Sequence, residues 1–124
     1  MGKISFSNNV KLSFWNIDQL YVNEYDARIC KLDNPDVIAD LVGDDIVVLA
    51  ETHCGWNDNP TLPGFAKPHQ HIRPKSKNAK KHYGGIAVFV KESIRRGVKF
   101  EPQTNSEFMW FRLDKTFFNM LNDL

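Results

Sequence analysis

The sequence predicts an α/β fold with a mixed sheet and flanking helices, and two observations carry this prediction. Short apolar runs have the length and composition of buried strands, at Lys11–Trp15, Asp45–Ala50 and Gly85–Val90. A helix signal lies between the first two runs, so strand, helix and strand follow one another as in a βαβ unit. The 124 residues suffice for one domain with its own core.

The N-terminal residues form a strand pattern and then lose it. Lys3–Ser7 and Lys11–Trp15 alternate polar and apolar residues around the turn-forming Asn8 and Asn9. The first run is therefore an edge partner of the second, or a flexible lead. Residues 17–29 have apolar positions that fit one face of a helix or an irregular loop, and we leave both alternatives open.

A helix is predicted to begin at Asn34. Asn34 can cap it, Pro35 suits the first helical position, and Asp36 favours the positive end of the helix dipole. Its apolar positions share one face, and Gly43 ends it. The strand Asp45–Ala50 follows after a short turn.

Beyond Glu51, Gly, Pro and Asn residues predict a long loop of about two dozen residues. Order returns at Gly85–Val90, which is apolar on both faces and therefore predicted to be a central strand. Val98–Phe100 and Phe108–Leu113 are predicted as two further strands, joined across a turn around residues 103–106.

The last ten residues, Lys115–Leu124, are rich in apolar side chains and have no C-terminal cap or polar tail. Such a surface needs a partner. We expect residues 1–124 to form a single partial domain, truncated at its C-terminus. Trp15, Trp110 and Phe111 are expected in the core.

Charge is nearly balanced overall, with a net charge of +1, but it is unevenly distributed. No acidic residue occurs between Asp58 and Glu92, a stretch that contains many lysines, arginines and histidines. Such a stretch predicts a basic surface loop. Five residues of this loop could contact a DNA backbone: Arg73, Lys75, Lys77, Lys80 and Lys81.

The cysteine content and the hydropathy of the sequence indicate in which cellular compartment the protein is expected. The two cysteines lie far apart and no leader precedes the first strand, so neither a disulfide framework nor secretion is indicated. No apolar run approaches the roughly 20 residues that span a bilayer. We expect an intracellular protein, nuclear or cytoplasmic, with no membrane partner.

Polar residues stand at the ends of the predicted buried strands. Asn16 follows the first strand, Glu51 ends the second, and Tyr83 precedes the third. Open α/β sheets place their chemistry just beyond strand ends, so these side chains are expected at one shared site. Glu51 is the candidate metal ligand.

Taken in order, four motifs make the sequence resemble the endonuclease/exonuclease/phosphatase superfamily. The resemblance is greatest to the apurinic-type endonuclease of non-LTR (LINE-like) retrotransposons. The motifs are Leu12–Ile17, Ile46–His53, Leu62–Phe65 and Tyr83–Val90. The resemblance implies a four-layered, DNase I-like α/β sandwich, of which this chain would be the N-terminal part. It also implies phosphodiester cleavage with a divalent metal.

The resemblance assigns roles to individual residues. Glu51 would be the carboxylate ligand, and Asn16 would lie beside it, holding the ligand shell and a phosphate oxygen. Tyr83 matches a position at which family members can place a tyrosine facing the phosphate. Magnesium, or manganese, suits such a site and would be weakly held here.

The sequence also departs from the family pattern. The aspartate that activates water, its neighbouring asparagine, and the terminal aspartate and histidine lie in the second half of the family domain. Loss of one acid or base group typically costs on the order of 10²–10⁴ in rate, so we expect this polypeptide alone to cleave DNA poorly.

Other interpretations stay open. Glu51 could be a solvated carboxylate, Asn16 a turn residue, and Tyr83 a ring laid on the sheet edge. The histidines could bind zinc, although only His69 and His71 are closely spaced. The chain could instead be a binding or self-assembly module completed by a second copy or another chain. A phosphatase of the same superfamily is a third possibility.

Overall fold

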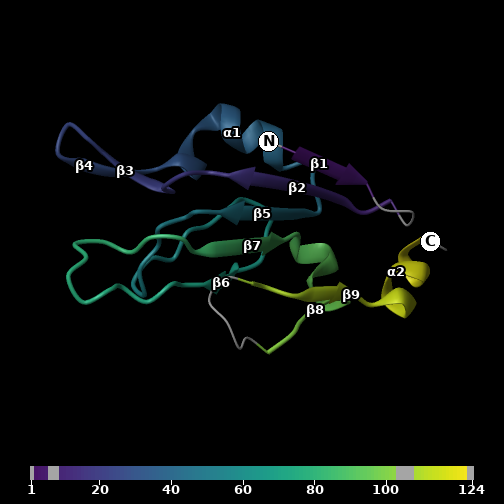
Figure 1. Ribbon diagram of the computed structural model, residues 1–124. Coiled ribbons are helices and arrows are strands. Elements are labelled where there is room, and N and C mark those ends of the chain that lie inside the picture. Colours follow the sequence, from purple (N-terminus) through teal and green to yellow (C-terminus); the bar gives the residue numbers. More distant parts are fainter. Residues whose placement is uncertain (1, 6–8, 103–107, 123–124) are drawn as a thin grey trace.

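The computed structural model describes residues 2–5, 9–102 and 108–122, and its centre is a five-stranded mixed sheet with the order β1-β2-β5-β7-β6 (Figure 1). Strands β2 and β5 are parallel, whereas the other neighbours are antiparallel. The mixed α/β sheet is therefore confirmed, and β7 is central as predicted. The strands are β1 (Gly2–Ser5), β2 (Lys11–Asn16), β5 (Ile46–Ala50), β6 (His69–His71) and β7 (Ile86–Val90).

The crossover between β2 and β5 contains the predicted helix, α1 (Pro35–Leu41), preceded by the 3-10 turn η1 (Lys31–Asp33). The Asn34 side chain accepts a hydrogen bond of 2.9 Å from the backbone N–H of Asp36. This bond satisfies one of the N–H groups that a helix start leaves without an intrahelical acceptor. The predicted strand, helix and strand order is confirmed.

One face of the sheet packs against α1 and η1. Strand register places Trp15, Leu49 and Ala87 in one row across this face, and Ser13, Val47 and Phe89 in the next. Leu32 and Leu41 cover these rows, and both are buried. Trp15 packs against this cluster, as expected for a core residue.

The second face of the sheet is the one that carries Leu12, Phe14 and Asn16 of β2, because side chains alternate along a strand. It packs in part against a separate two-stranded antiparallel sheet, β8 (Val98–Phe100) and β9 (Phe111–Leu113), and against α2 (Lys115–Asn122). Toward β1 it is open: Phe14 is 46% exposed and Ile4 is 55% exposed.

Residues 17–29 form neither of the predicted structures. They contain a β-hairpin, β3 (Tyr21–Glu24) and β4 (Ala27–Cys30), closed by the two residues Tyr25 and Asp26. Both turn residues have positive φ, 47° and 65°, which is the geometry of a tight hairpin turn. The sequence lacks the Asn-Gly or Asp-Gly pair that usually marks such a turn, so the prediction was wrong.

The apolar C-terminal segment, to which the sequence analysis assigned neither a helix nor a strand, forms a helix. This helix is α2, and Asp114 Oδ1 accepts a hydrogen bond of 3.1 Å from Phe117 N at the helix start. Phe118 is 3% exposed, and a Cβ at Gly97 would overlap the Phe117 ring. The capping aspartate was the signal that could have identified this helix.

Smaller differences concern the loops. The long loop after Glu51 contains the short strand β6, and Trp110, expected in the core, is 70% exposed, whereas Phe111 is partly buried. The pairing of β8 with β9 is confirmed, but β9 is shorter than predicted. The turn predicted at 103–106 and the turn residue Asn8 lie outside the described residues. In the described part of the chain, no helix has the length and apolarity needed to cross a membrane.

Candidate functional site

The predicted site residues lie at one edge of the sheet. Asn16 pairs with Ala50, and Ala50 pairs with Ile86, so the end of β2, the end of β5 and the start of β7 meet in one row. Beyond this row Ile17 N donates to Ala50 O at 3.0 Å, and Gln19 N donates to Glu51 O at 2.8 Å. Asn16 and Glu51 therefore lie on neighbouring chain segments, as the sequence predicted.

Glu51 leaves the strand with an unusual backbone. Its φ is +57°, and that of His53 is +55°, a region that residues other than glycine seldom adopt. The Glu51 side chain is 51% exposed, and its Oε2 lies 3.5 Å from His53 Nε2. Strained backbone of this kind collects at functional sites. The carboxylate is thus accessible and held next to a histidine that the sequence did not assign to the site.

The turn from Tyr83 to Gly85 supports the Glu51 segment from the side of β7. Thr52 N donates to Gly85 O at 3.2 Å, and His53 N donates to Gly84 O at 2.8 Å. The rings of Tyr83 and His53 meet edge to face with centroids 5.3 Å apart. Tyr83 is half exposed and joins the Glu51 neighbourhood through this histidine.

Part of the basic loop closes on the same place. Arg73, Lys75 and Lys81 line a small cavity of about 170 Å³ together with Tyr83. Lys81 Nζ lies 5.0 Å from the centre of the Tyr83 ring. The Arg73 guanidinium packs against Gly84, where a Cβ would lie 3.0 Å from it. Three of the five basic residues singled out in the sequence are thereby gathered beside Tyr83.

The other two basic residues, Lys77 and Lys80, lie on the same loop but do not line the cavity. The loop is fixed at its base, where His82 Nδ1 and Arg73 O are 2.8 Å apart. We therefore separate the predicted set into Arg73, Lys75 and Lys81, which share a cavity, and Lys77 and Lys80, which do not.

The donor atoms near Glu51 suit a hard cation that keeps most of its water. Glu51 offers an accessible carboxylate, and Asn16 offers an amide oxygen that accepts a hydrogen bond of 3.2 Å from Asp18 N. Mg²⁺ commonly binds through one or two carboxylates and retains several waters. That bond also gives Asn16 the turn role considered from the sequence, and the two roles are compatible.

Zinc fits less well. Among the described residues, no group of three or more His, Cys, Asp or Glu side chains could hold a metal ion. His69 stacks on Phe100 with ring centroids 4.1 Å apart, on the second face of the sheet. The zinc interpretation therefore has no ligand set in the part of the chain described here.

The β3–β4 hairpin is attached to the segment that follows Glu51. Arg28 Nη1 donates to Asp58 Oδ1 at 2.7 Å, and Asp58 Oδ2 accepts from Gly55 N at 2.7 Å. Burial acts to raise the pKa of Asp58, but the hydrogen bonds from Arg28 and Gly55 outweigh it and leave the pKa below its usual value. Arg28 and Asp58 are thirty positions apart in the chain, so no local sequence pattern predicts this ion pair.

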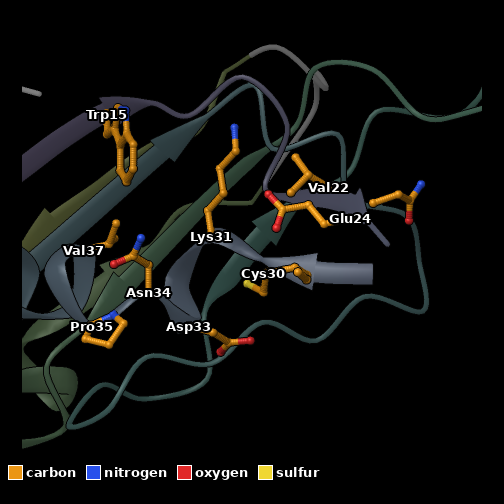
Figure 2. Close-up of a pocket in the computed structure, with 11 residues that line it drawn as sticks. Trp15, Val22, Glu24, Cys30, Lys31, Asp33, Asn34, Pro35 and Val37 are labelled. Carbon is orange, nitrogen blue, oxygen red and sulfur yellow. The ribbon is translucent and has the colours of Figure 1, made fainter. Parts of the chain in front are cut away.

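A hollow of about 730 Å³ lies elsewhere (Figure 2). It is bounded by the β3–β4 hairpin, η1 and α1, and Trp15 lies on its wall. Trp15 and Asn16 point to opposite faces of β2, so this hollow opens on the side away from Asn16. Lys31 on its rim is engaged with the carbonyls of Ile17 and Asp18 at 2.9 and 3.0 Å. None of the predicted site residues lines it.

Comparison with models of protein families shows to which family the chain is related. The family model described as "Endonuclease/Exonuclease/phosphatase family" matches residues 14–121. The chain belongs to the endonuclease/exonuclease/phosphatase family. Comparison with curated proteins and with solved structures found no match. The family has a DNase I-like α/β fold, in agreement with the mixed sheet observed here.

Members of the endonuclease/exonuclease/phosphatase family generally use divalent metals. This agrees with the oxygen donors of Glu51 and Asn16, although these residues alone make an incomplete ligand shell. The family membership confirms the superfamily to which the sequence motifs pointed.

Proposed function

We propose that the chain is a divalent-metal-dependent phosphodiesterase domain of the LINE-like endonuclease type, with DNA as its substrate. One observation carries the proposal. A continuous series of contacts runs from the Glu51 carboxylate to His53, from His53 to Tyr83, and from Tyr83 to Lys81 at the basic cavity. These contacts support the proposal because they join the candidate metal ligand to the candidate phosphate-binding cations at one edge of the sheet.

In this proposal, the residues of the candidate site have different roles. Glu51 and Asn16 would hold Mg²⁺ or Mn²⁺, and His53 would orient the carboxylate. When bound, the metal neutralises charge that develops on the phosphate and on the leaving oxygen. Arg73, Lys75 and Lys81 would hold a backbone phosphate, and Tyr83, which lines the same cavity and contacts His53, would face that phosphate. Lys77 and Lys80 would add long-range attraction to the DNA.

The first test is metal binding. Replacing Glu51 by glutamine keeps the size of the side chain but removes its charge, so Mn²⁺ affinity should fall at least about tenfold. Electron paramagnetic resonance titration of Mn²⁺ measures this directly. Glu92→Gln is the matched control, because Glu92 is exposed and follows the opposite end of β7.

If Glu51→Gln binds Mn²⁺ as tightly as the parent protein and the control Glu92→Gln, Glu51 is not a metal ligand. Circular dichroism of the variants separates loss of binding from loss of fold. If both variants weaken binding equally, the effect is one of net charge and the proposed site is also wrong.

We further propose that these 124 residues, taken alone, cleave DNA poorly. Among the described residues, Glu51 and His53 belong to no group of three or more His, Cys, Asp or Glu side chains that could hold a metal ion. In this proposal, no residue of this chain has the role of activating the attacking water. Nicking of supercoiled plasmid in Mg²⁺ should therefore not exceed that of Glu51→Gln by more than about tenfold. A parent rate that Glu51→Gln lowers by several orders of magnitude would contradict this.

A second candidate function is self-assembly through the second face of the sheet. Phe14 and Ile4 are 46% and 55% exposed on this face, and strand β1 has no neighbour on its outer side in the described sheet. Apolar surface beside an unpaired edge favours association with a second copy. A sedimentation coefficient that rises with concentration would support this function, and a constant monomer value would reject it.

A further inference from the structure

The tip of the β3–β4 hairpin carries an aromatic residue in an unfavourable backbone conformation. Tyr25 is fully exposed, and its φ of 47° is one that bulky residues rarely adopt. Asn and Gly are the residues that such a turn prefers. An exposed ring contributes little to the core, so a conformational cost at this position points to a role outside folding.

The hairpin starts at the edge of the sheet where Glu51 lies. Leu20 N donates to Thr52 O at 2.9 Å, and β3 begins at the next residue, Tyr21. Tyr25 stands four residues further along, about 13 Å beyond Tyr21 in an extended strand. Figure 1 shows that the hairpin and the loop between β6 and β7 leave the sheet at the same end. The hairpin that carries Tyr25 and the loop that carries the basic cavity therefore project from the same end of the sheet.

The position of the tip is fixed by contacts. All four residues of β3 pair with β4. Arg28 bonds Asp58 at 2.7 Å in the segment after Glu51, and its guanidinium lies 4.0 Å from the centre of the Tyr21 ring. The hairpin is therefore attached to the Glu51 segment both at its base and along its length. The backbone that carries the Tyr25 ring therefore loses little conformational freedom on binding.

The charges of the tip decide which part of a nucleic acid it can meet. Glu24 and Asp26 flank Tyr25, so the tip is acidic and repels a phosphate backbone. The basic residues Arg73, Lys75 and Lys81 stand at the other loop. A strand bound with its phosphates at the basic cavity would turn an uncharged base toward Tyr25.

We propose that Tyr25 stacks on an unpaired base of the nucleic acid substrate. This inference rests on the proposed function, because it takes the basic cavity as the backbone contact. In a regular duplex both faces of each base are covered by neighbours, so a ring on a fixed hairpin needs a base that is single-stranded or displaced. The preferred substrate is therefore DNA with an unpaired nucleotide.

The test uses Tyr25→Asn, which removes the ring and at the same time supplies a residue suited to positive φ. Binding is measured by fluorescence anisotropy in EDTA, with one fully paired duplex and one duplex carrying a single unpaired nucleotide. The parent protein should prefer the second DNA. Tyr25→Asn should lose about 5- to 150-fold in affinity for it, and little for the paired duplex.

Controls separate stacking from other effects. The thermal midpoint of Tyr25→Asn should equal or exceed that of the parent, so unfolding cannot explain weaker binding. Tyr25→Phe keeps the ring and should keep most of the affinity. Lys81→Gln should weaken both DNAs alike, because it acts on the backbone contact.

Three outcomes would overturn the inference. If Tyr25→Asn binds the unpaired DNA as tightly as the parent while Lys81→Gln does not, Tyr25 has no stacking role but the backbone contact stands. If the parent binds both DNAs equally and Tyr25→Asn weakens both, the ring does not select an unpaired base. If the parent binds neither DNA, the inference fails together with the DNA substrate, whereas the metal site is judged by the Mn²⁺ titration of Glu51→Gln.

Discussion

Replacement of Gly85 by alanine is expected to destabilise the protein by about 2–5 kcal/mol, from backbone strain and overpacking together. Gly85 has a φ of +90°, and a Cβ there would lie 2.6 Å from the Thr52 hydroxyl oxygen. Thr52 is 2% exposed and its backbone is bonded to Gly85 O, so it cannot move aside without shifting the Glu51 segment.

Urea unfolding of the Gly85→Ala variant measures this change. Gly43→Ala is the matched control, because nothing lies within 4 Å of a Cβ at Gly43 and it should be tolerated. Adding Thr52→Ala should recover part of the loss by removing the hydroxyl, while the strain in φ remains. If Gly85→Ala is as stable as Gly43→Ala, the Thr52 and Gly85 segments do not approach each other as closely as described.

The site should respond as well. The loop from Glu51 to His53 is hydrogen-bonded to Gly84 and Gly85, so a shift of this turn displaces the carboxylate. We therefore expect Gly85→Ala to weaken Mn²⁺ binding even in samples that remain folded at low temperature. Unchanged affinity in a folded variant would separate the metal site from this turn.

Phe89→Ala is expected to cost about 3–5 kcal/mol, because it empties the centre of the core. Phe89 is fully buried in β7, opposite Val47, on the face that α1 covers. Since small domains are stable by only about 5–15 kcal/mol, this single change should bring the protein close to unfolding.

Phe14→Ala is the matched control, with the same pair of residue types on the second face. Phe14 is 46% exposed, so its removal should cost less than about 1 kcal/mol in a monomer. Urea unfolding of both variants at two protein concentrations makes the comparison. A small loss of stability for Phe89→Ala would contradict the placement of Phe89 at the centre of the core. A large loss for Phe14→Ala that grows with protein concentration would show that a second copy covers this face.

Local patterns predicted the strands and helix of the crossover because each depends on neighbouring residues. The Asn34–Pro35–Asp36 sequence satisfies the helix start by itself. The apolar runs of β5 and β7 have the length of strands and are rich in the β-branched residues Val and Ile, which favours buried strands. The β3–β4 hairpin escaped prediction because its turn uses Tyr25 and Asp26 in place of turn-favouring residues. Helix α2 escaped because the capping role of Asp114 was overlooked.

The candidate site shows the same division. Glu51, Asn16 and Tyr83 were predicted to lie together because strand ends converge in an α/β sheet, and their chain segments do meet at one edge. The contact of His53 with Glu51 was not predictable, since it depends on positive φ at both residues. Nor could the sequence tell which lysines of the basic loop gather beside Tyr83, because a loop path depends on tertiary contacts.

The sequence by itself determined the α/β class, the crossover of β2, α1 and β5, the family, and the residues at the strand ends, because these follow from local pattern and motif order. The tertiary structure alone decided the partners of those residues. It placed His53 against Glu51, Arg73 over Gly84, and Arg28 on Asp58. Such contacts join residues distant in the chain, and their geometry is set by the packing of whole segments.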